Sequence, residues 1–311
     1  MAGEYTHDWS RDDDTGTGAG WGGPVGIAWE SGLLAGLAEG GVDVSNADSI
    51  TGTSAGSAVG AQIAMGRTPR QIYAAVAADA TRRPPSPARG SDGGLPAPTL
   101  APLMELMQRA AKENLDPGAL RREIGAFALA ATTMSEEAFL ATFGRVLANA
   151  EAWPHPGYRC TAVDALTGEF VTWTAESGVP LNRAVASSCS VPGIYPPITI
   201  NGRRYIDGGM RSATNADLAR GSDVVLVVAV TTGAREPMAE SSRRRLESEL
   251  AAIRDGGGEA ILVQPDNASQ EAFGINLMDF GKRAGAAGAG YAQGKAEAAR
   301  IAELWNRPSW R

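Results

Sequence analysis

The segment 224–230 most constrains the fold of this chain, because its seven residues are all apolar and five of them are valine. A strand with one face in water alternates apolar and polar residues, whereas an unbroken β-branched run is typical of a strand buried on both faces. Residues 260–263 form a shorter run of the same kind, and residues 241–254 between them have a helical pattern. Strands that alternate with helices predict a three-layer α/β/α fold with a mostly parallel central sheet.

Further segments fit this alternation. A short strand is predicted at 47–51, and the pair Asn201-Gly202 between alternating apolar positions is a strong signal for a β-hairpin at 198–206. A second hairpin is predicted at 158–174, around a turn that ends at Gly168. Helices are expected at 27–39, 180–188, 241–254 and 284–305.

The chain is expected to form one main domain. Residues 1–17 are polar and predict a solvated tail, and residues 18–305 predict a single α/β domain. Within this domain, the pattern of residues 67–156 is mainly helical and predicts a helical insertion. The Pro/Gly-rich segment 83–102 interrupts this insertion and is too long for an ordinary connection.

Charge and cysteine content exclude several classes of function. The net charge is −7, which argues against nucleic acid as the main partner but is compatible with a peripheral lipid contact through an apolar patch. Cys160 and Cys189 are too few for a disulfide framework and do not match a metal-ligand spacing, so no metal is expected. The sequence shows no secretory signal and no 18-residue apolar run, so a cytoplasmic protein is expected.

The first candidate for chemistry is Ser54, in the sequence Gly52-Thr-Ser-Ala-Gly56. Glycines two residues before and after a serine allow a sharp turn between a strand and a helix, which projects the hydroxyl above the sheet edge. The following helix places free N–H groups and a partial positive charge near the hydroxyl. The structural alternative is a turn of small residues that only packs the helix close to the strand.

A serine hydroxyl needs a base, and the histidine content limits the choice. The sequence contains only His7, in the polar tail, and His155, well before the last strands. A Ser-His-Asp triad in the α/β-hydrolase order requires a later histidine, so a carboxylate is the better candidate. Asp207 ends a hairpin strand and precedes Gly208 and Gly209, which permit close approach. Taken alone, an ordinary Asp-Gly turn is the alternative interpretation.

The glycine-rich loop at 18–26 is the candidate oxyanion site. Gly22 and Gly23 lie just before a predicted helix and can direct backbone N–H groups inward. The spacing of Gly18, Gly20 and Gly23 also fits a dinucleotide-binding pattern. That pattern requires a hydrophobic strand before the loop, and residues 11–17 do not predict one. No nucleotide cofactor is therefore expected.

In this order, the glycine-rich loop, Gly52-Thr-Ser-Ala-Gly56 and Asp207-Gly-Gly209 resemble the patatin-like phospholipase family. Shorter stretches at 26–30, 186–197 and 215–218 add to a resemblance that covers roughly residues 18–300.

The resemblance implies a single α/β/α domain and a metal-independent lipid acyl hydrolase with a Ser-Asp dyad. Ser54 would be the nucleophile, Asp207 the proton acceptor, and the glycine loop the oxyanion hole. The expected partner is a lipid or fatty acyl ester, and the sequence leaves the oligomeric state open. Because a polar segment replaces the family's usual apolar strand before the loop, a catalytically impaired lipid-binding or regulatory protein is the alternative.

Overall fold

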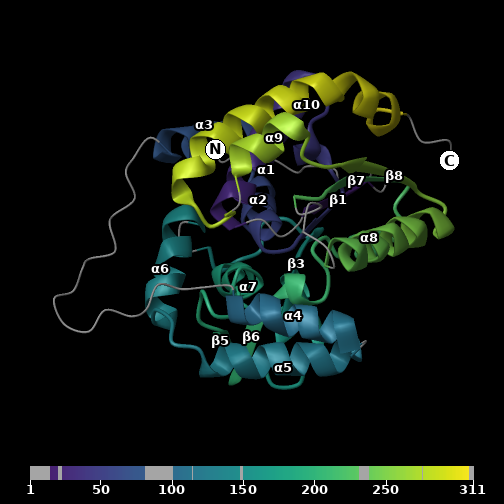
Figure 1. Ribbon diagram of the computed structural model, residues 1–311. Coiled ribbons are helices and arrows are strands. Elements are labelled where there is room, and N and C mark those ends of the chain that lie inside the picture. Colours follow the sequence, from purple (N-terminus) through teal and green to yellow (C-terminus); the bar gives the residue numbers. More distant parts are fainter. Residues whose placement is uncertain are drawn as a thin grey trace.

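The structure is a computed structural model that describes residues 15–19, 23–80, 101–113, 115–147, 150–230, 238–274 and 276–307. One eight-stranded sheet runs through it (Figure 1), in the order β5-β6-β3-β2-β1-β7-β8, with β4 paired to β3. The strands are β1 (Thr15–Ala19), β2 (Ser49–Gly52), β3 (Tyr158–Asp164), β4 (Phe170–Trp173), β5 (Ile198–Ile200), β6 (Arg203–Asp207), β7 (Val224–Val228) and β8 (Glu259–Val263).

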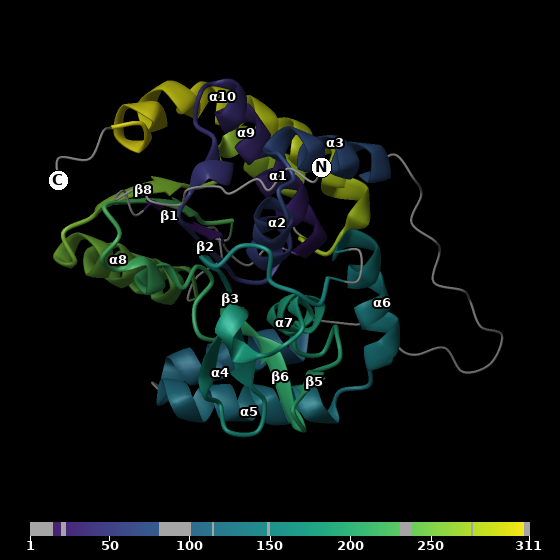
Figure 2. The ribbon, with the colours of Figure 1, turned by 180° about the vertical axis from the view of Figure 1, so that it is seen from behind.

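Helices cover both faces of this sheet. They are α1 (Gly23–Glu39), α2 (Ala55–Ala64), α3 (Pro69–Ala80), α4 (Ala101–Glu113), α5 (Pro117–Ala130), α6 (Glu136–Leu147), α7 (Leu181–Ser188), α8 (Met238–Asp255), α9 (Asn267–Phe273) and α10 (Arg283–Trp305). Helices α1, α9 and α10 lie on one side of β7 and β8, and α8 lies on the other, as Figures 1 and 2 both show. None of the described helices is long and apolar enough to cross a bilayer.

The side chains of β7 explain why this strand is apolar throughout. Leu226 and Val228 belong to the main core together with residues of α1 and α10. Val225 and Val227 instead pack with Leu250 of α8. Successive side chains of a strand point to opposite faces, so both faces of β7 are buried and need apolar residues. The three-layer prediction is therefore confirmed.

The sheet is mixed, with its parallel pairs in the centre. β1 pairs in parallel with β2 and β7, β2 with β3, and β7 with β8. The antiparallel pairs come from the two predicted hairpins and from the pairing of β3 with β6. At the β5–β6 turn, Asn201 and Gly202 have φ values of 50° and 75°, as a tight hairpin turn requires. The prediction of a mostly parallel sheet is confirmed, and the strands β4, β5 and β6 add antiparallel pairs on one side of it.

The prediction that no strand precedes the glycine-rich loop is wrong. Residues Thr15–Ala19 form β1, which lies between β2 and β7 in the middle of the sheet. Its sequence, Thr-Gly-Thr-Gly-Ala, has no apolar pattern, but neighbours on both sides supply ladder hydrogen bonds, and such tertiary pairing overrides local propensity. The strand thus begins inside the predicted tail at 1–17, and residues 1–14 lie outside the described residues.

The region predicted as a helical insertion, 67–156, contains α3 to α6. Helix α3 packs against α1 and α10, whereas Leu103 of α4 and Ile124 of α5 pack against Val163 and Ile206 of the β3–β6 sheet edge. Residues 81–100, most of the predicted Pro/Gly-rich segment at 83–102, lie outside the described residues.

Candidate active site

Ser54 occupies a strained turn between β2 and α2. Its backbone has φ 54° and ψ −118°, and it is one of three non-glycine residues with positive φ in the described part of the chain. Non-glycine residues in this region cost energy and are held there only by the surrounding structure. Ser54 is also only 2% exposed. This is the conformation expected of a serine in a strand–turn–helix nucleophile elbow.

The motif glycines make this turn possible. A Cβ atom on Gly52 would lie 2.4 Å from the Cα of Ser57, so only glycine allows the start of α2 to approach the end of β2 so closely. Gly56 lies in the first turn of α2, and its N–H donates to the carbonyl of Thr53 at 3.1 Å. The carbonyl of Ser54 in turn accepts from the Ser57 hydroxyl at 2.6 Å. The first glycine of the motif therefore has a local structural reason.

Asp207 ends β6 and is completely buried. Its Oδ1 accepts a hydrogen bond from the N–H of Gly209 at 2.7 Å, which fixes the orientation of the carboxyl group. A Cβ atom on Gly208 would lie 2.1 Å from the Oγ1 of Thr161, so the chain after Asp207 runs directly against β3.

The sheet register brings Ser54 and Asp207 to the same level. In the β2–β3 pair Gly52 lies opposite Cys160, so Ser54 lies near the level of Ala162. In the β3–β6 pair Asp207 lies opposite Ala162. Neighbouring strands are about 4.8 Å apart, and only one strand, β3, separates the two residues.

The end of α7 joins the two candidate residues from the other direction. The N–H of Ser54 donates to the hydroxyl of Ser188 at 3.0 Å, and the thiol of Cys189 donates to the Ser54 carbonyl at 3.1 Å. The next residue, Ser190, accepts the N–H of Asp207 on its carbonyl at 3.1 Å. Three consecutive residues thus link the two candidates: Ser188 and Cys189 contact Ser54, and Ser190 contacts Asp207.

Cys189 is a neutral partner in this arrangement. Burial raises the pKa of its thiol well above the ordinary value, and the negative charge of Asp207 raises it further. Cys160, on β3, also has a raised pKa because it is buried. A buried thiol with a raised pKa does not supply a thiolate nucleophile.

The predicted oxyanion residues lie at the start of α1. Gly23 begins this helix with φ 54°, and Gly22 lies outside the described residues. One turn later, a Cβ atom on Gly26 would lie 3.5 Å from the Cβ of Ala55, the residue after Ser54. The N-terminal turn of α1, with its partial positive charge, therefore lies beside the serine turn.

His155 lies away from this site. It precedes β3, whose first residue Tyr158 pairs with Ile50, whereas Ser54 lies beyond the other end of β2. Its Nδ1 accepts the N–H of Gly157 at 3.0 Å, and burial lowers its pKa. In the described ranges, no group of three or more His, Cys, Asp or Glu side chains is arranged to hold a metal ion.

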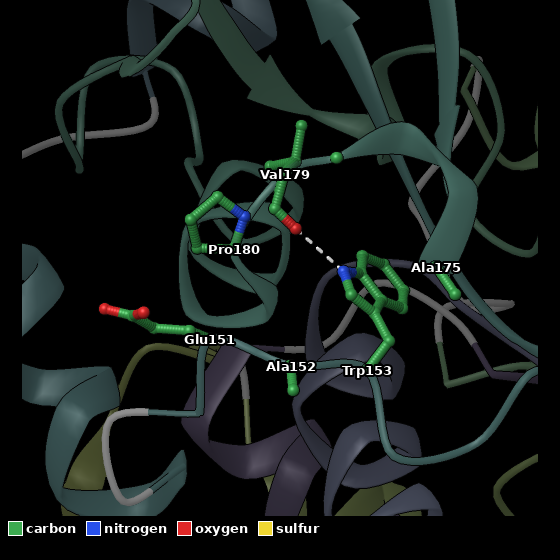
Figure 3. Close-up of a pocket in the computed structure, with 7 residues that line it drawn as sticks. Glu151, Ala152, Trp153, Ala175, Val179 and Pro180 are labelled. Carbon is green, nitrogen blue, oxygen red and sulfur yellow. Dashed lines mark hydrogen bonds between the residues drawn. The ribbon is translucent and has the colours of Figure 1, made fainter.

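A separate surface recess of about 350 Å³ lies between the loops before β3 and α7 (Figure 3). The indole N–H of Trp153 donates to the carbonyl of Val179 at 2.7 Å at its edge. It is lined by Glu151, Ala152, Trp153, Ala175, Gly178, Val179 and Pro180. Neither Ser54 nor Asp207 lines it, so the recess is not part of the candidate active site.

The sequence pattern did not assign roles to Ser188, Cys189, Ser190 or Asn215, all of which contact the site. Their stretches, 186–197 and 215–218, were singled out only through the family resemblance. The Pro-Gly and Pro-Pro pairs in 186–197 mark an irregular loop, but no spacing rule connects such a loop to a serine more than a hundred residues earlier.

Together, a three-layer α/β/α fold and a strained, buried serine between a strand and a helix define a class of proteins that can carry a serine nucleophile. The chain belongs to the patatin-like phospholipase family, whose sequence model matches residues 22–220. This membership indicates a lipid acyl hydrolase.

No curated protein sequence matched the chain. Among solved structures, it is similar to the crystal structure of VipD from Legionella pneumophila, with 12% sequence identity and a TM-score of 0.46. The match covers 93% of this chain and 67% of the other.

Proposed function

We propose that this protein is a serine lipid acyl hydrolase in which Ser54 is the nucleophile and Asp207 the proton acceptor. The observation that carries the proposal is the register that sets a strained, buried serine and a buried aspartate on either side of Ala162. Strained backbone at a buried polar residue is typical of a functional site.

In the first step, the Oγ of Ser54 attacks the carbonyl carbon of an acyl ester while its proton passes to the Asp207 carboxylate. A C–O bond forms, and the π electrons of the carbonyl move to its oxygen. When this tetrahedral intermediate collapses, the bond to the alcohol breaks and Asp207 returns the proton to the leaving oxygen. An aspartate is a weak base, so proton transfer must accompany the attack.

In the second step, water attacks the acyl group on Ser54 and gives its proton to Asp207. Collapse of the second intermediate breaks the bond to Ser54, whose Oγ recovers that proton, and the fatty acid is released. In both steps the oxyanion needs N–H donors, and we assign these to Gly22 and Gly23, of which Gly23 begins the helix beside the serine turn. Each such donor contributes about a hundredfold to a thousandfold in rate.

The proposal is tested by covalent labelling of the purified chain with a fluorophosphonate, together with hydrolysis of a short-chain p-nitrophenyl ester. Labelling and hydrolysis are expected in the wild type, to be absent in Ser54→Ala, and to fall by about a hundredfold to ten-thousandfold in Asp207→Asn. Two exposed residues on α8 provide matched controls, Ser242→Ala and Asp255→Asn, which should behave as the wild type.

A folded wild-type protein that neither reacts with the fluorophosphonate nor hydrolyses the ester would contradict the proposal. It would favour a lipid-binding protein with the same fold.

We also propose that the protein meets its substrate at a lipid surface. Three of its four most exposed large apolar side chains, among the described residues, are Leu129 and Met134 at and just beyond the end of α5 and Leu166 in the β3–β4 turn. The twelve residues 124–135 carry no charge. Gly125 of α5 packs directly on the backbone of Ala165, so the β3–β4 turn lies against the middle of α5, one helical turn before Leu129. Exposed apolar patches of this kind serve as membrane or protein contact sites.

A further inference from the structure

Asn215 combines two features that are uncommon for an asparagine outside a tight turn. It is completely buried, and its backbone is left-handed, with φ 49° and ψ 35°. It lies in the loop that follows Asp207-Gly-Gly209 and immediately precedes a single 3₁₀ turn, Ala216–Ala219. A buried amide must satisfy its hydrogen bonds within the protein, so the partners of this side chain show what it does.

The side-chain amide nitrogen of Asn215 lies between the segments that carry Ser54 and Asp207. It donates to the hydroxyl of Thr53 at 3.0 Å, and Thr53 directly precedes Ser54. It also lies 3.4 Å from the carbonyl of Gly208, which directly follows Asp207. Its shortest hydrogen bond, at 2.8 Å, is to the carbonyl of Ser212 in its own loop. One NH₂ group therefore ties this loop to the residue before the proposed nucleophile and lies near the residue after the proposed base.

Strand β3, which separates the two segments, takes part in the same network. The hydroxyl of Thr161 lies 2.8 Å from that of Thr53 and 3.4 Å from the Asn215 amide nitrogen. Because a Cβ atom at Gly208 would also collide with Thr161, the chain after Asp207 already touches β3 and has no room to move closer. The Asn215 amide thus contacts all three segments, the one before Ser54, strand β3 and the one after Asp207.

The orientation of the Asn215 amide is fixed by its other contacts. Its Oδ1 accepts a hydrogen bond from Arg211 at 2.7 Å, and arginine can only donate, so the nitrogen must face Thr53 and Gly208. Arg211 itself is held by an ion pair with Asp217.

The backbone around Asn215 is anchored on α8. The buried carboxylate of Glu249 accepts the N–H of Ala216 at 3.0 Å and the hydroxyl of Thr214. The residues on both sides of Asn215 are therefore tied to one rigid helix.

We infer that Asn215 is a positioning residue that sets the separation of Ser54 and Asp207. This inference rests on the proposed function, because it concerns the distance over which the Ser54 proton is transferred. The amide acts through Thr53 and Gly208 and touches neither the substrate nor the reacting atoms. A misplacement of about 1 Å between reacting groups can cost about a hundredfold in rate.

The test is the nearly isosteric substitution Asn215→Asp, which keeps an oxygen for Arg211 but places a second oxygen against the carbonyls of Ser212 and Gly208 in place of the donor. We expect kcat for the short-chain ester to fall by about a hundredfold while KM changes little, because substrate contacts are unaffected. Asn201→Asp is the matched control: Asn201 has nearly the same φ, 50°, but lies exposed in the β5–β6 turn. It should keep wild-type kcat.

A second variant keeps the inference testable if Asn215→Asp does not fold. Thr53→Val removes the hydroxyl that accepts from Asn215 and keeps the side-chain shape, and it should also lower kcat with little change in KM. In urea unfolding, the effects of Thr53→Val and Asn215→Asp should be non-additive if the two side chains interact, and this readout does not depend on activity.

The outcomes separate this inference from the proposed function. If the wild type hydrolyses the ester, Ser54→Ala does not, and folded Asn215→Asp and Thr53→Val both keep wild-type kcat, the positioning role is overturned while the function stands. An inactive wild type that also fails to react with the fluorophosphonate overturns the function and, with it, the role of Asn215 in proton transfer.

Discussion

The backbone N–H of Ser54 donates to the hydroxyl of Ser188 at 3.0 Å, across 134 positions of sequence. Both residues are buried, so this hydrogen bond is shielded from solvent and holds the strained serine turn against the end of α7. Two contacts thus fix the turn. Ser188 accepts from the backbone N–H of Ser54, and Ser57 in the first turn of α2 donates to its carbonyl.

Removing the Ser188 hydroxyl should therefore loosen the serine turn. In Ser188→Ala the buried N–H of Ser54 has no acceptor, which should lower the free energy of unfolding by about 1–3 kcal/mol. Ester hydrolysis should fall more than substrate binding, because the nucleophile moves and the substrate contacts do not. Urea unfolding and steady-state kinetics measure the two effects. Ser242→Ala on the exposed face of α8 is the control, and equal stability of the two variants would contradict the expectation.

The fold could be predicted from the sequence where one segment carries its own signal. The valine run of β7 and the Asn201-Gly202 turn are local patterns, and both lie in the structure as predicted. β1 could not be predicted, because Thr-Gly-Thr-Gly-Ala becomes a strand only through its neighbours β2 and β7. A central position in the sheet supplies what the local sequence lacks.

The candidate site divides in the same way. Gly52 before Ser54 and Gly208 after Asp207 mark backbone positions where a side chain cannot fit, and glycine spacing is visible in a sequence. Ser188 and Asn215 act through hydrogen bonds to groups that are distant in the sequence. A lone serine or asparagine has no periodicity or spacing that would distinguish it from many others, so their roles become visible only in three dimensions.

The strain at Ser54 makes a prediction about stability. Glycine adopts positive φ without the steric cost that a side chain incurs, so Ser54→Gly should relieve the turn. Strain of this kind costs about 1–3 kcal/mol of folding free energy. The greater conformational entropy of glycine in the unfolded chain offsets part of the stability gained by relieving it. We expect Ser54→Gly to unfold at a higher urea concentration than Ser54→Ala, with both inactive. Ser54→Ala is the matched control because it lacks the hydroxyl but keeps the strain.

The buried thiols make the stability depend on pH. Burial raises the pKa of Cys160 and of Cys189 in the folded protein. Above pH about 8.5 the unfolded chain therefore loses protons that the folded chain keeps, and stability falls as the pH rises, by about 1.4 kcal/mol per pH unit for each thiol. Urea unfolding between pH 7.5 and 9.5 should show this fall.

The thiol origin of that slope can be isolated. In Cys160→Ala, one of the two buried thiols is absent, and the alkaline slope should be about half that of the wild type even though the variant is less stable at every pH. Native Cys189 should also resist iodoacetamide at pH 8.5 and react in urea. An unchanged slope in Cys160→Ala would show that other groups cause the pH dependence.

The exposed apolar side chains predict where the protein contacts lipid. Leu166 is 77% exposed at the tip of the β3–β4 turn, which packs on α5 through the contact of Ala165 with Gly125. Leu166→Asp should weaken sedimentation with neutral phosphatidylcholine vesicles severalfold, because a charged group enters the apolar lipid region only at a cost.

Using the Ser54→Ala background removes lipid hydrolysis from the measurement. Ser242→Asp adds the same charge on α8 and should bind as the parent does. If both charged variants bind equally well, the surface around Leu166 is not the lipid contact, and the short-chain ester activity remains a separate question because that substrate needs no membrane.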